Sequence, residues 1–284
     1  MKNNINYLDI PAFLLNFPFT LDNKEANNKW IQELDEDKKI IDVDKAYDQF
    51  LELYSFMSSD SLIYLLPSQG NFQDQTYVAN LGIKLHHIED RNIVVLSNFT
   101  SIPRQGEEKV GAKFFELMDF DEIFYSPYKW EGEADLKYIK DNIYIGGYGI
   151  RSQKETYEWM SEKFNMNIIS VKMKDEYLYH LDCSVFPLTK NDIVMCTKLF
   201  DKEELQKIEK YCNIIDIDED CTYNGLTNSV RLNNLILCAS DLHELKVGTE
   251  LYEIEKWKVD TLNDICADNG FEPVLFNLSE FMKE

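Results

Sequence analysis

The sequence contains no long apolar run. No stretch of about 18 apolar residues, the length that a transmembrane helix requires, occurs in the chain of 284 residues. The first residues, Met-Lys-Asn-Asn-Ile-Asn-Tyr, also lack the apolar core of a signal peptide. We therefore expect a soluble, cytoplasmic protein without a membrane partner.

Basic residues are few. The chain has 29 lysines and arginines against 51 aspartates and glutamates, which gives a formal net charge of −22. Because such a negative field repels a phosphate backbone, we expect no nucleic-acid partner. The same charge keeps a protein soluble, and it also attracts small cations. The charge by itself does not distinguish these two roles.

Patterns typical of disulfide frameworks and nucleotide sites are absent. The six cysteines form no C-x-x-C pair and no regular spacing, so we expect reduced and mostly buried thiols. The glycine-rich segment at 146–149 follows an expected strand, but it lacks the G-x-G-x-x-G spacing of a dinucleotide site. Nucleotide binding is therefore not expected.

The residues that are present can build a large core. The chain is 44% hydrophobic and 13% aromatic, which suits one elaborate domain or two ordinary ones. Within it, hydrophobic periodicity and turn residues predict a recurring cycle of strand, strand, helix and strand. The first copy has expected strands at 75–80, 92–96 and 123–125 and a helix at 105–118, and the second has strands at 135–138, 143–145 and 168–171 and a helix opened by a capping box of Ser152 and Glu155. The third copy has expected strands at 181–186, 193–195 and 214–217 and a helix capped by Asp201. The fourth has strands at 229–232, 235–238 and 273–276 and a helix at 250–268.

The N-terminal part predicts an incomplete fifth copy, with a strand at 6–13, a helix at 43–58 and a strand at 62–66. Radial repetition of short sheets protects strand edges, as in a propeller. We therefore expect a single domain over residues 1–284 that forms a five-bladed α/β propeller. The last residues stop one strand before closure, so the expected domain is C-terminally incomplete.

Acidic residues gather around one histidine in the predicted repeats. His180 and Asp182 lie two residues apart, and a strand would place both side chains on one face. The segment Trp130–Asp135 adds further carboxylates. Such a cluster suits a planar cation that undergoes proton transfer, and a guanidinium group fits because carboxylates can bind its N–H donors in pairs.

Four segments carry a resemblance to a known family. They are Asp74–Asn80, Glu131–Asp135, His180–Asp182 and, more weakly, Asn28–Trp30. In this order they resemble the motifs of the guanidino-group modifying enzymes, the pentein superfamily, which includes dimethylarginine dimethylaminohydrolase, arginine dihydrolase, arginine deiminase and the amidinotransferases. Glu133 and Ala134 depart from the stricter E-G-G-D pattern of the family. Each segment alone is also typical of an ordinary turn or core residue, but their joint order favours a site.

The resemblance implies roles for individual residues. Its catalytic residues would be His180, Glu131 and Asp182, and its substrate contacts would be Asp74, Asn80, Asn28 and Asp135. His180 would exchange protons, while Glu131 and Asp182 would hold the guanidinium and orient His180. The resemblance implies no metal and no cofactor. The implied partner is a small cationic guanidino compound such as arginine, and the sequence leaves open whether the chain forms a homo-oligomer.

The cysteine nucleophile of the family has no equivalent within these residues. The resemblance places it after a segment similar to 277–281, beyond residue 284. Cys183 is expected to pack in the core, because neighbouring residues of a strand point to opposite faces and Asp182 would face the site. The same alternation disfavours a metal site built from Glu131, His180, Asp182 and Cys183. The sequence thus predicts a hydrolase acting on the guanidino carbon–nitrogen bond of arginine or an N-substituted arginine. An amidinotransferase and a catalytically inactive guanidine-binding protein remain alternatives.

Overall fold

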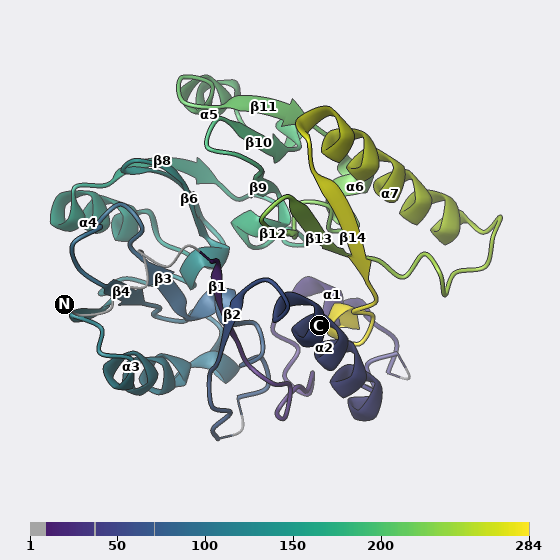
Figure 1. Ribbon diagram of the computed structural model, residues 1–284, viewed down its shortest axis with the longest axis horizontal. Coiled ribbons are helices and arrows are strands. Elements are labelled where there is room, and N and C mark those ends of the chain that lie inside the picture. The colour runs from purple at the N-terminus through teal and green to yellow at the C-terminus, as the bar shows by residue number, and fades with distance from the viewer. Residues whose placement is uncertain (1–9, 37, 71, 284) are drawn as a thin grey trace.

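Small mixed sheets and surface helices alternate along the chain (Figure 1). The computed structural model describes residues 10–36, 38–70 and 72–283. Their strands form five separate sheets, of which four have three strands and one has two. The fold is therefore α/β, as predicted.

The four three-stranded sheets repeat one arrangement. In each, the first strand is antiparallel to the second, and the second is parallel to the third across a helix. The four units are β3 (Gly82–Lys84), β4 (Ile93–Leu96), α3 (Glu107–Leu117) and β5 (Glu122–Tyr125); β6 (Leu136–Lys140), β7 (Ile143–Tyr148), α4 (Lys154–Phe164) and β8 (Asn167–Lys172); β9 (Val185–Pro187), β10 (Asp192–Met195), α5 (Lys202–Ile208) and β11 (Asn213–Asp216); β12 (Val230–Leu232), β13 (Leu235–Ala239), α7 (Glu250–Asn269) and β14 (Glu272–Phe276). The predicted order of strand, strand, helix and strand is confirmed in all four, although the first strands of two units begin later than predicted.

The remaining sheet pairs β1 (Ala12–Leu15) with β2 (Leu62–Leu65) in parallel, and α2 (Val43–Met57) connects them. In each of the other four sheets the middle strand has an antiparallel neighbour. β1 has no such neighbour among the described residues. Residues 6–9 of the strand predicted at 6–13 lie outside the described residues. The other elements are α1 (Lys29–Glu33), α6 (Glu219–Tyr223) and short 3₁₀ helices at Val78–Leu81, Ile102–Arg104, Gly132–Ala134, Leu181–Cys183, Thr197–Leu199 and Phe281–Lys283.

Local sequence explains several of these boundaries. All four residues of β4, Ile-Val-Val-Leu, are buried, as expected for a middle strand covered on both faces. Helix α7 ends at Gly270, which takes the left-handed conformation with φ +75°. The hairpin between β12 and β13 turns through Asn233, whose φ is +56°.

Two predicted strands and one predicted helix cap were wrong. The strand predicted at 75–80 is a turn followed by the 3₁₀ helix Val78–Leu81, and the strand predicted at 181–186 is a 3₁₀ helix followed by β9. Helix α4 begins after Gln153 without a side-chain cap. Ser152 does not cap it, because its hydroxyl donates to Asp135 and accepts from the backbone N–H of Glu131. In each case polar residues form the site instead of regular structure.

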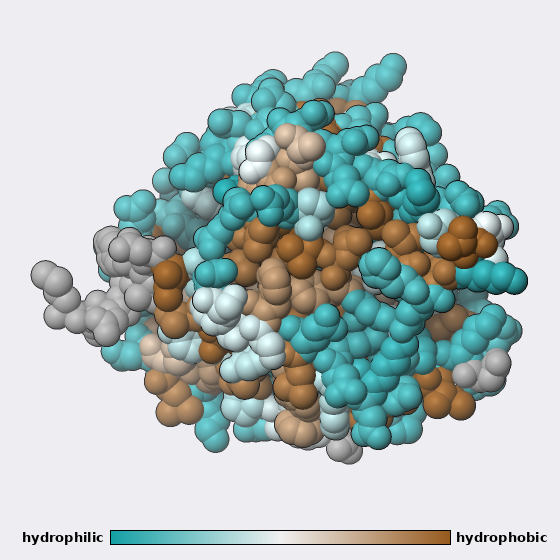
Figure 2. All heavy atoms as spheres, turned by 45° about the vertical axis from the view of Figure 1, so that its right-hand side comes forward, coloured by the Kyte–Doolittle hydropathy of each residue, from teal (hydrophilic) through white to brown (hydrophobic). Residues whose placement is uncertain are grey.

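Five hydrophobic clusters join consecutive sheets. The cluster around Leu237 and Phe276 connects the sheet of β1 with the sheet of β14, so the two ends of the chain pack together. It is the most open cluster, with four buried and eight partly buried members. The face in Figure 2 carries an apolar area near its middle, surrounded by hydrophilic side chains.

The C-terminal segment is fixed to α2. Gln49 Nε2 donates to Asn277 and Ser279, and Glu280 accepts the backbone N–H of Asp42. All six cysteines are free thiols and five are buried, which confirms that prediction. Among residues 10–36, 38–70 and 72–283, no helix combines the length and the apolar character that a bilayer crossing needs.

Replacing Asp201 by alanine is expected to lower the free energy of unfolding by about 1 kcal/mol, because Asp201 and Glu204 form the capping box of α5. Urea unfolding measures this change. Gln206→Ala, at an exposed position of the same helix, is the control and should leave the midpoint nearly unchanged. Equal midpoints for Asp201→Ala and the native chain would contradict the capping role.

Candidate active site

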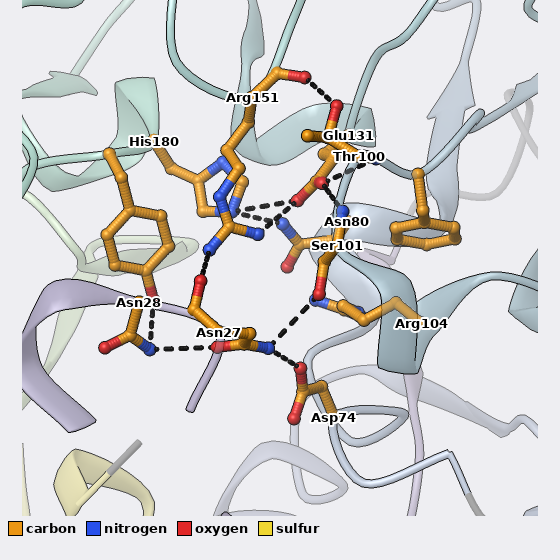
Figure 3. A network of polar contacts seen from close by, with 12 residues as sticks. Asn27, Asn28, Asp74, Asn80, Thr100, Ser101, Arg104, Glu131, Arg151 and His180 are labelled. Atoms are coloured by element: carbon orange, nitrogen blue, oxygen red, sulfur yellow. Dashed lines mark hydrogen bonds and ion pairs between the residues drawn. The ribbon is translucent and has the colours of Figure 1, made fainter. Parts of the chain in front are cut away.

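The predicted motifs converge on His180 (Figure 3). Its Nδ1 lies 3.1 Å from Oδ1 of Asp135, and its Nε2 lies 2.9 Å from Nδ2 of Asn80. The same Nε2 is 3.4 Å from Oε2 of Glu131. All four side chains are buried. Residues that lie 100 positions apart in the sequence thus share one polar cluster.

A glycine allows two of these motifs to approach. Gly132 follows Glu131 with φ +68°, and a Cβ atom there would lie 2.4 Å from the carbonyl oxygen of Ala79. Only glycine fits this combination of left-handed backbone and close contact. The approach brings the 3₁₀ helix Gly132–Ala134 against Val78–Leu81 and therefore Glu131 beside Asn80.

Glu131 is a fully buried carboxylate with defined partners. Its Oε1 accepts the backbone N–H groups of Thr100 and Ser101 at 3.0 and 2.9 Å. Its Oε2 accepts from Arg151 at 3.2 Å. Burial acts to raise the pKa of Glu131, but the charges of His180 and Arg151 and the backbone donors outweigh it, so the pKa is lowered. Glu131 therefore stays ionised.

Asp135 orients the histidine. Its Oδ1 accepts the backbone N–H of Leu181 as well as the proton on Nδ1 of His180, and its Oδ2 accepts the hydroxyl of Ser152 at 2.6 Å. Because the ionised carboxylate of Asp135 can only accept, the contact at Nδ1 of His180 places a ring proton on that nitrogen. Nε2 of His180 faces Asn80 and Glu131.

Asp182 does not occupy the place that the sequence predicted. It lies in the 3₁₀ helix Leu181–Cys183 rather than on a strand, so alternation does not align it with His180. Its carboxylate is 3.8 Å from Nζ of Lys137 and 3.7 Å from Sγ of Cys183. The carboxylate that contacts Nδ1 of His180 is that of Asp135. The argument that Asp182 and Cys183 point apart was wrong, because they contact each other.

Asp74 and Asn28 lie at the edge of the cluster. Asp74 is buried; one of its oxygens accepts from Asn27, and Oδ1 has no partner among the described residues. Asn28 caps α1 by accepting the N–H of Ile31, and its Nδ2 donates to the hydroxyl of Tyr179 at 3.3 Å. The Oδ1 atom of Asp74 is closed to solvent in this structure, and the positive charge of Arg104 acts on the carboxylate.

The sequence analysis missed Arg151. This guanidinium is 8% exposed, donates to Glu131 and to the backbone oxygen of Asn27, and lies 4.7 Å from the ring centroid of Tyr179. Arg104 was missed as well: it donates to both oxygens of Glu107 and to the carbonyl of Tyr77. No local pattern marks a buried arginine, because its burial depends on residues far away in the sequence.

Lowering the pH from neutral through the raised pKa of Asp74 is expected to weaken binding of a cation at this site. Burial raises the pKa of Asp74 above its ordinary value of 3.8, so it is protonated at a higher pH than an exposed aspartate. A bound cation favours the ionised form and releases the proton, so affinity falls as pH falls through the raised pKa. In the free protein, folding stability depends on pH with the opposite sign. A raised pKa of Asp74 means that stability falls as the pH rises and Asp74 ionises.

Calorimetric titration with L-arginine at several pH values measures this effect. The control is Asp74→Asn, which should bind more weakly and lose part of the pH dependence. An unchanged pH profile in that variant would assign the dependence to another group.

Sequence comparison finds relatives named as enzymes that act on arginine or methylated arginine. The chain is 26% identical over 246 residues to the bifunctional arginine dihydrolase/ornithine cyclodeaminase AgrE of Nostoc sp., covering 84% of this chain and 32% of that protein. It is 23% identical over 154 residues to the N(G),N(G)-dimethylarginine dimethylaminohydrolase of Mycobacterium tuberculosis, covering 54% and 49%. Homologues of this chain are pentein enzymes. The predicted resemblance is thereby confirmed.

Solved pentein structures share the fold. The N-terminal domain of the cyanobacterial arginine dihydrolase ArgZ, bound to product, superposes with a TM-score of 0.81 at 23% identity, covering 97% of this chain and 93% of that domain. A dimethylarginine dimethylaminohydrolase gives 0.69 at 17% identity, covering 96% and 95%. The chain spans about a third of the bifunctional relatives, 32% of their length. No family model matches it.

Proposed function

We propose that this chain binds arginine or an N-substituted arginine and belongs to an enzyme that hydrolyses a guanidino carbon–nitrogen bond. The observation that carries the proposal is the ionised, buried Glu131 beside the Asp135-oriented His180. A carboxylate that binds a planar cation next to a proton carrier is the arrangement that this reaction needs. The named relatives are hydrolases of such compounds.

Arg151 supports a guanidinium ligand directly. Its own guanidinium donates to Glu131 and stacks on Tyr179, so this carboxylate and ring already accept the group that an arginine substrate would bring. The buried carboxylate of Asp74 at the edge of the cluster would pair with the ammonium of such a substrate. Arginine carries both of these positive groups.

The proposed reaction proceeds in two steps. A thiolate sulfur bonds to the guanidinium carbon, and the bond from that carbon to the departing amine breaks while His180 gives the amine a proton. His180 then takes a proton from water, whose oxygen attacks the same carbon and breaks the carbon–sulfur bond. Glu131 and Asn80 hold the guanidinium, and Asp135 stabilises the charged imidazole.

The six cysteines of this chain are poor candidates for the thiolate. Burial raises the pKa of every one of them, to about 12 for Cys221 and about 11 for Cys266. They are therefore thiols near neutral pH. We infer that the nucleophile comes from residues that follow Glu284 in a longer chain. The carbonyl of Phe281 accepts the hydroxyl of Tyr77, three residues from Asp74, so the segment 281–283 lies near the site.

The residues that we infer to follow Glu284 would also complete the fold. The five sheets, joined in sequence by five hydrophobic clusters that also unite the two ends of the chain, suit a five-bladed propeller. The edge of β1 that has no partner among the described residues, and the open cluster beside it, would receive an antiparallel strand. That strand would complete the fifth blade and carry the thiol to His180. The cytoplasmic location expected from the sequence is part of this proposal.

Product analysis tests the proposed function. The chain and a version extended by its following residues are incubated with L-arginine and its N-methylated forms, and ornithine, citrulline, ammonia and dimethylamine are measured. Products from the extended version alone support a nucleophile outside residues 1–284. Transfer of the amidino group to an added amine would instead identify an amidinotransferase, and saturable arginine binding without any product would identify a binding protein. No arginine binding would overturn the proposal.

A further inference from the structure

The guanidinium of Arg151 points into the candidate active site (Figure 3). Its Nη1 donates to Oε2 of Glu131 at 3.2 Å, and the same Oε2 lies 3.4 Å from Nε2 of His180. Proton transfer requires groups within hydrogen-bond reach, so the proposed substrate must place its guanidinium beside these two atoms. Arg151 therefore lies where the substrate would bring its own guanidinium.

Three contacts hold the side chain of Arg151 in this place. Besides the contact with Glu131, Nη2 donates to the backbone oxygen of Asn27 at 2.7 Å, and the guanidinium lies 4.7 Å from the ring centroid of Tyr179. The side chain of Arg151 is 8% exposed and that of Glu131 is fully buried. Like charges repel most strongly where little water is present, so a second guanidinium cannot be added beside the first.

Arg151 is the member of this ion pair that can move away. Oε1 of Glu131 is fixed by the backbone N–H groups of Thr100 and Ser101. The backbone of Arg151 is fixed too, because its carbonyl accepts the hydroxyl of Thr100 at 2.6 Å. The long side chain of Arg151 can still change rotamer. Such a rotation would free Oε2 of Glu131 and the carbonyl of Asn27 while the backbone stays in place.

We propose, resting on the proposed function, that Arg151 is an internal competitor of the substrate and thereby determines specificity. A guanidino compound reaches Glu131 only after the side chain of Arg151 has left. The apparent affinity is then the intrinsic affinity multiplied by the fraction of molecules in which Arg151 is displaced. A compound that offers a guanidinium alone has no second contact to offset this displacement, whereas the ammonium of arginine would pair with Asp74. The site thus discriminates against small guanidines.

Calorimetric titration of the intact chain with methylguanidine tests this competition, because the compound carries the guanidinium without the ammonium and carboxylate of arginine. Arg151→Ala removes the competitor and leaves its volume open to the ligand. This variant is expected to bind methylguanidine about tenfold or more tightly than the native chain. Arg151→Lys should show a smaller gain, because a lysine keeps the charge but lacks the planar fork of donors that contacts Glu131 and Asn27 together.

Two controls separate occupation of the site from a change in net charge. Lys129 donates to the carbonyl of Phe99, next to Thr100, and its listed contacts do not include Glu131. Lys129→Ala should therefore bind methylguanidine within about twofold of the native affinity. In a Glu131→Gln background, Arg151→Ala should produce no gain, because the carboxylate for which the two guanidinium groups compete has been removed.

Equal or weaker binding of methylguanidine by Arg151→Ala would overturn the proposal. A gain of the same size in Lys129→Ala, or a gain that persists in the Glu131→Gln background, would overturn it as well, because net charge would then explain the effect. Thermal unfolding reports whether Arg151→Ala is folded, and methylguanidine should raise its midpoint more than that of the native chain. If Arg151→Ala does not fold, Arg151→Lys decides, and an affinity equal to the native value would overturn the proposal.

The same titrations distinguish this proposal from the proposed function. Failure of the native chain to bind L-arginine would count against the proposed function alone, since the comparison of Arg151→Ala with the native chain uses methylguanidine and involves no arginine.

Discussion

Replacing Glu131 by glutamine is expected to weaken arginine binding by about 100-fold or more. The substitution keeps the size of the side chain but removes the charge that the buried site offers to a guanidinium. Losing one member of a buried, hydrogen-bonded charge pair costs about 2–5 kcal/mol, which corresponds to roughly 30- to 4000-fold in affinity. Calorimetric titration with L-arginine measures the change.

The matched control is Glu133→Gln in the 3₁₀ helix that follows Glu131. Glu133 is exposed, whereas Glu131 is fully buried, so the control removes the same charge without touching the site. Its affinity for arginine should stay within about twofold of the native value. If both variants lost affinity equally, long-range charge rather than direct contact would explain arginine binding. Unchanged affinity in Glu131→Gln would remove Glu131 from the site.

Replacing Asp135 by asparagine is expected to lower kcat by about 10²- to 10⁴-fold in the catalytically active form, with KM changed only a few-fold. Asparagine can still accept from Leu181 and contact Ser152, so the fold should persist. It cannot stabilise a charged His180, however, because it carries no negative charge. Steady-state kinetics separates the two parameters, and urea unfolding reports whether the structure is retained.

A double-mutant comparison makes this prediction specific. His180→Ala is expected to reduce turnover to a small residual rate while the chain stays folded. Because Asp135 acts through His180, adding Asp135→Asn to His180→Ala should reduce activity no further. A further loss in the double variant would mean that Asp135 has a separate role. Undiminished turnover in His180→Ala would remove the histidine from the mechanism.

The sequence predicted elements well where hydrophobic periodicity dominates. The four repeats and the caps at Asp201 and Gly270 follow from local patterns, because strands and helices bury their apolar residues at fixed spacings. It failed at segments 75–80 and 181–186, where polar side chains bend the chain into turns and 3₁₀ helices. In those segments hydrogen bonds to distant residues determine the backbone, and periodicity carries no information about them.

The sequence by itself determined which chemical groups this protein offers: a histidine, several carboxylates and an amide in a recognisable order, on a chain of alternating strands and helices. Only the tertiary structure decided how these groups are paired. It assigned the orientation of His180 to Asp135 rather than Asp182, placed Arg151 on Glu131, and left one oxygen of Asp74 without a partner. The reason is physical, since hydrogen bonds and charge pairs depend on distances of a few ångströms between residues from different sheets, and sequence spacing fixes such distances only within one element.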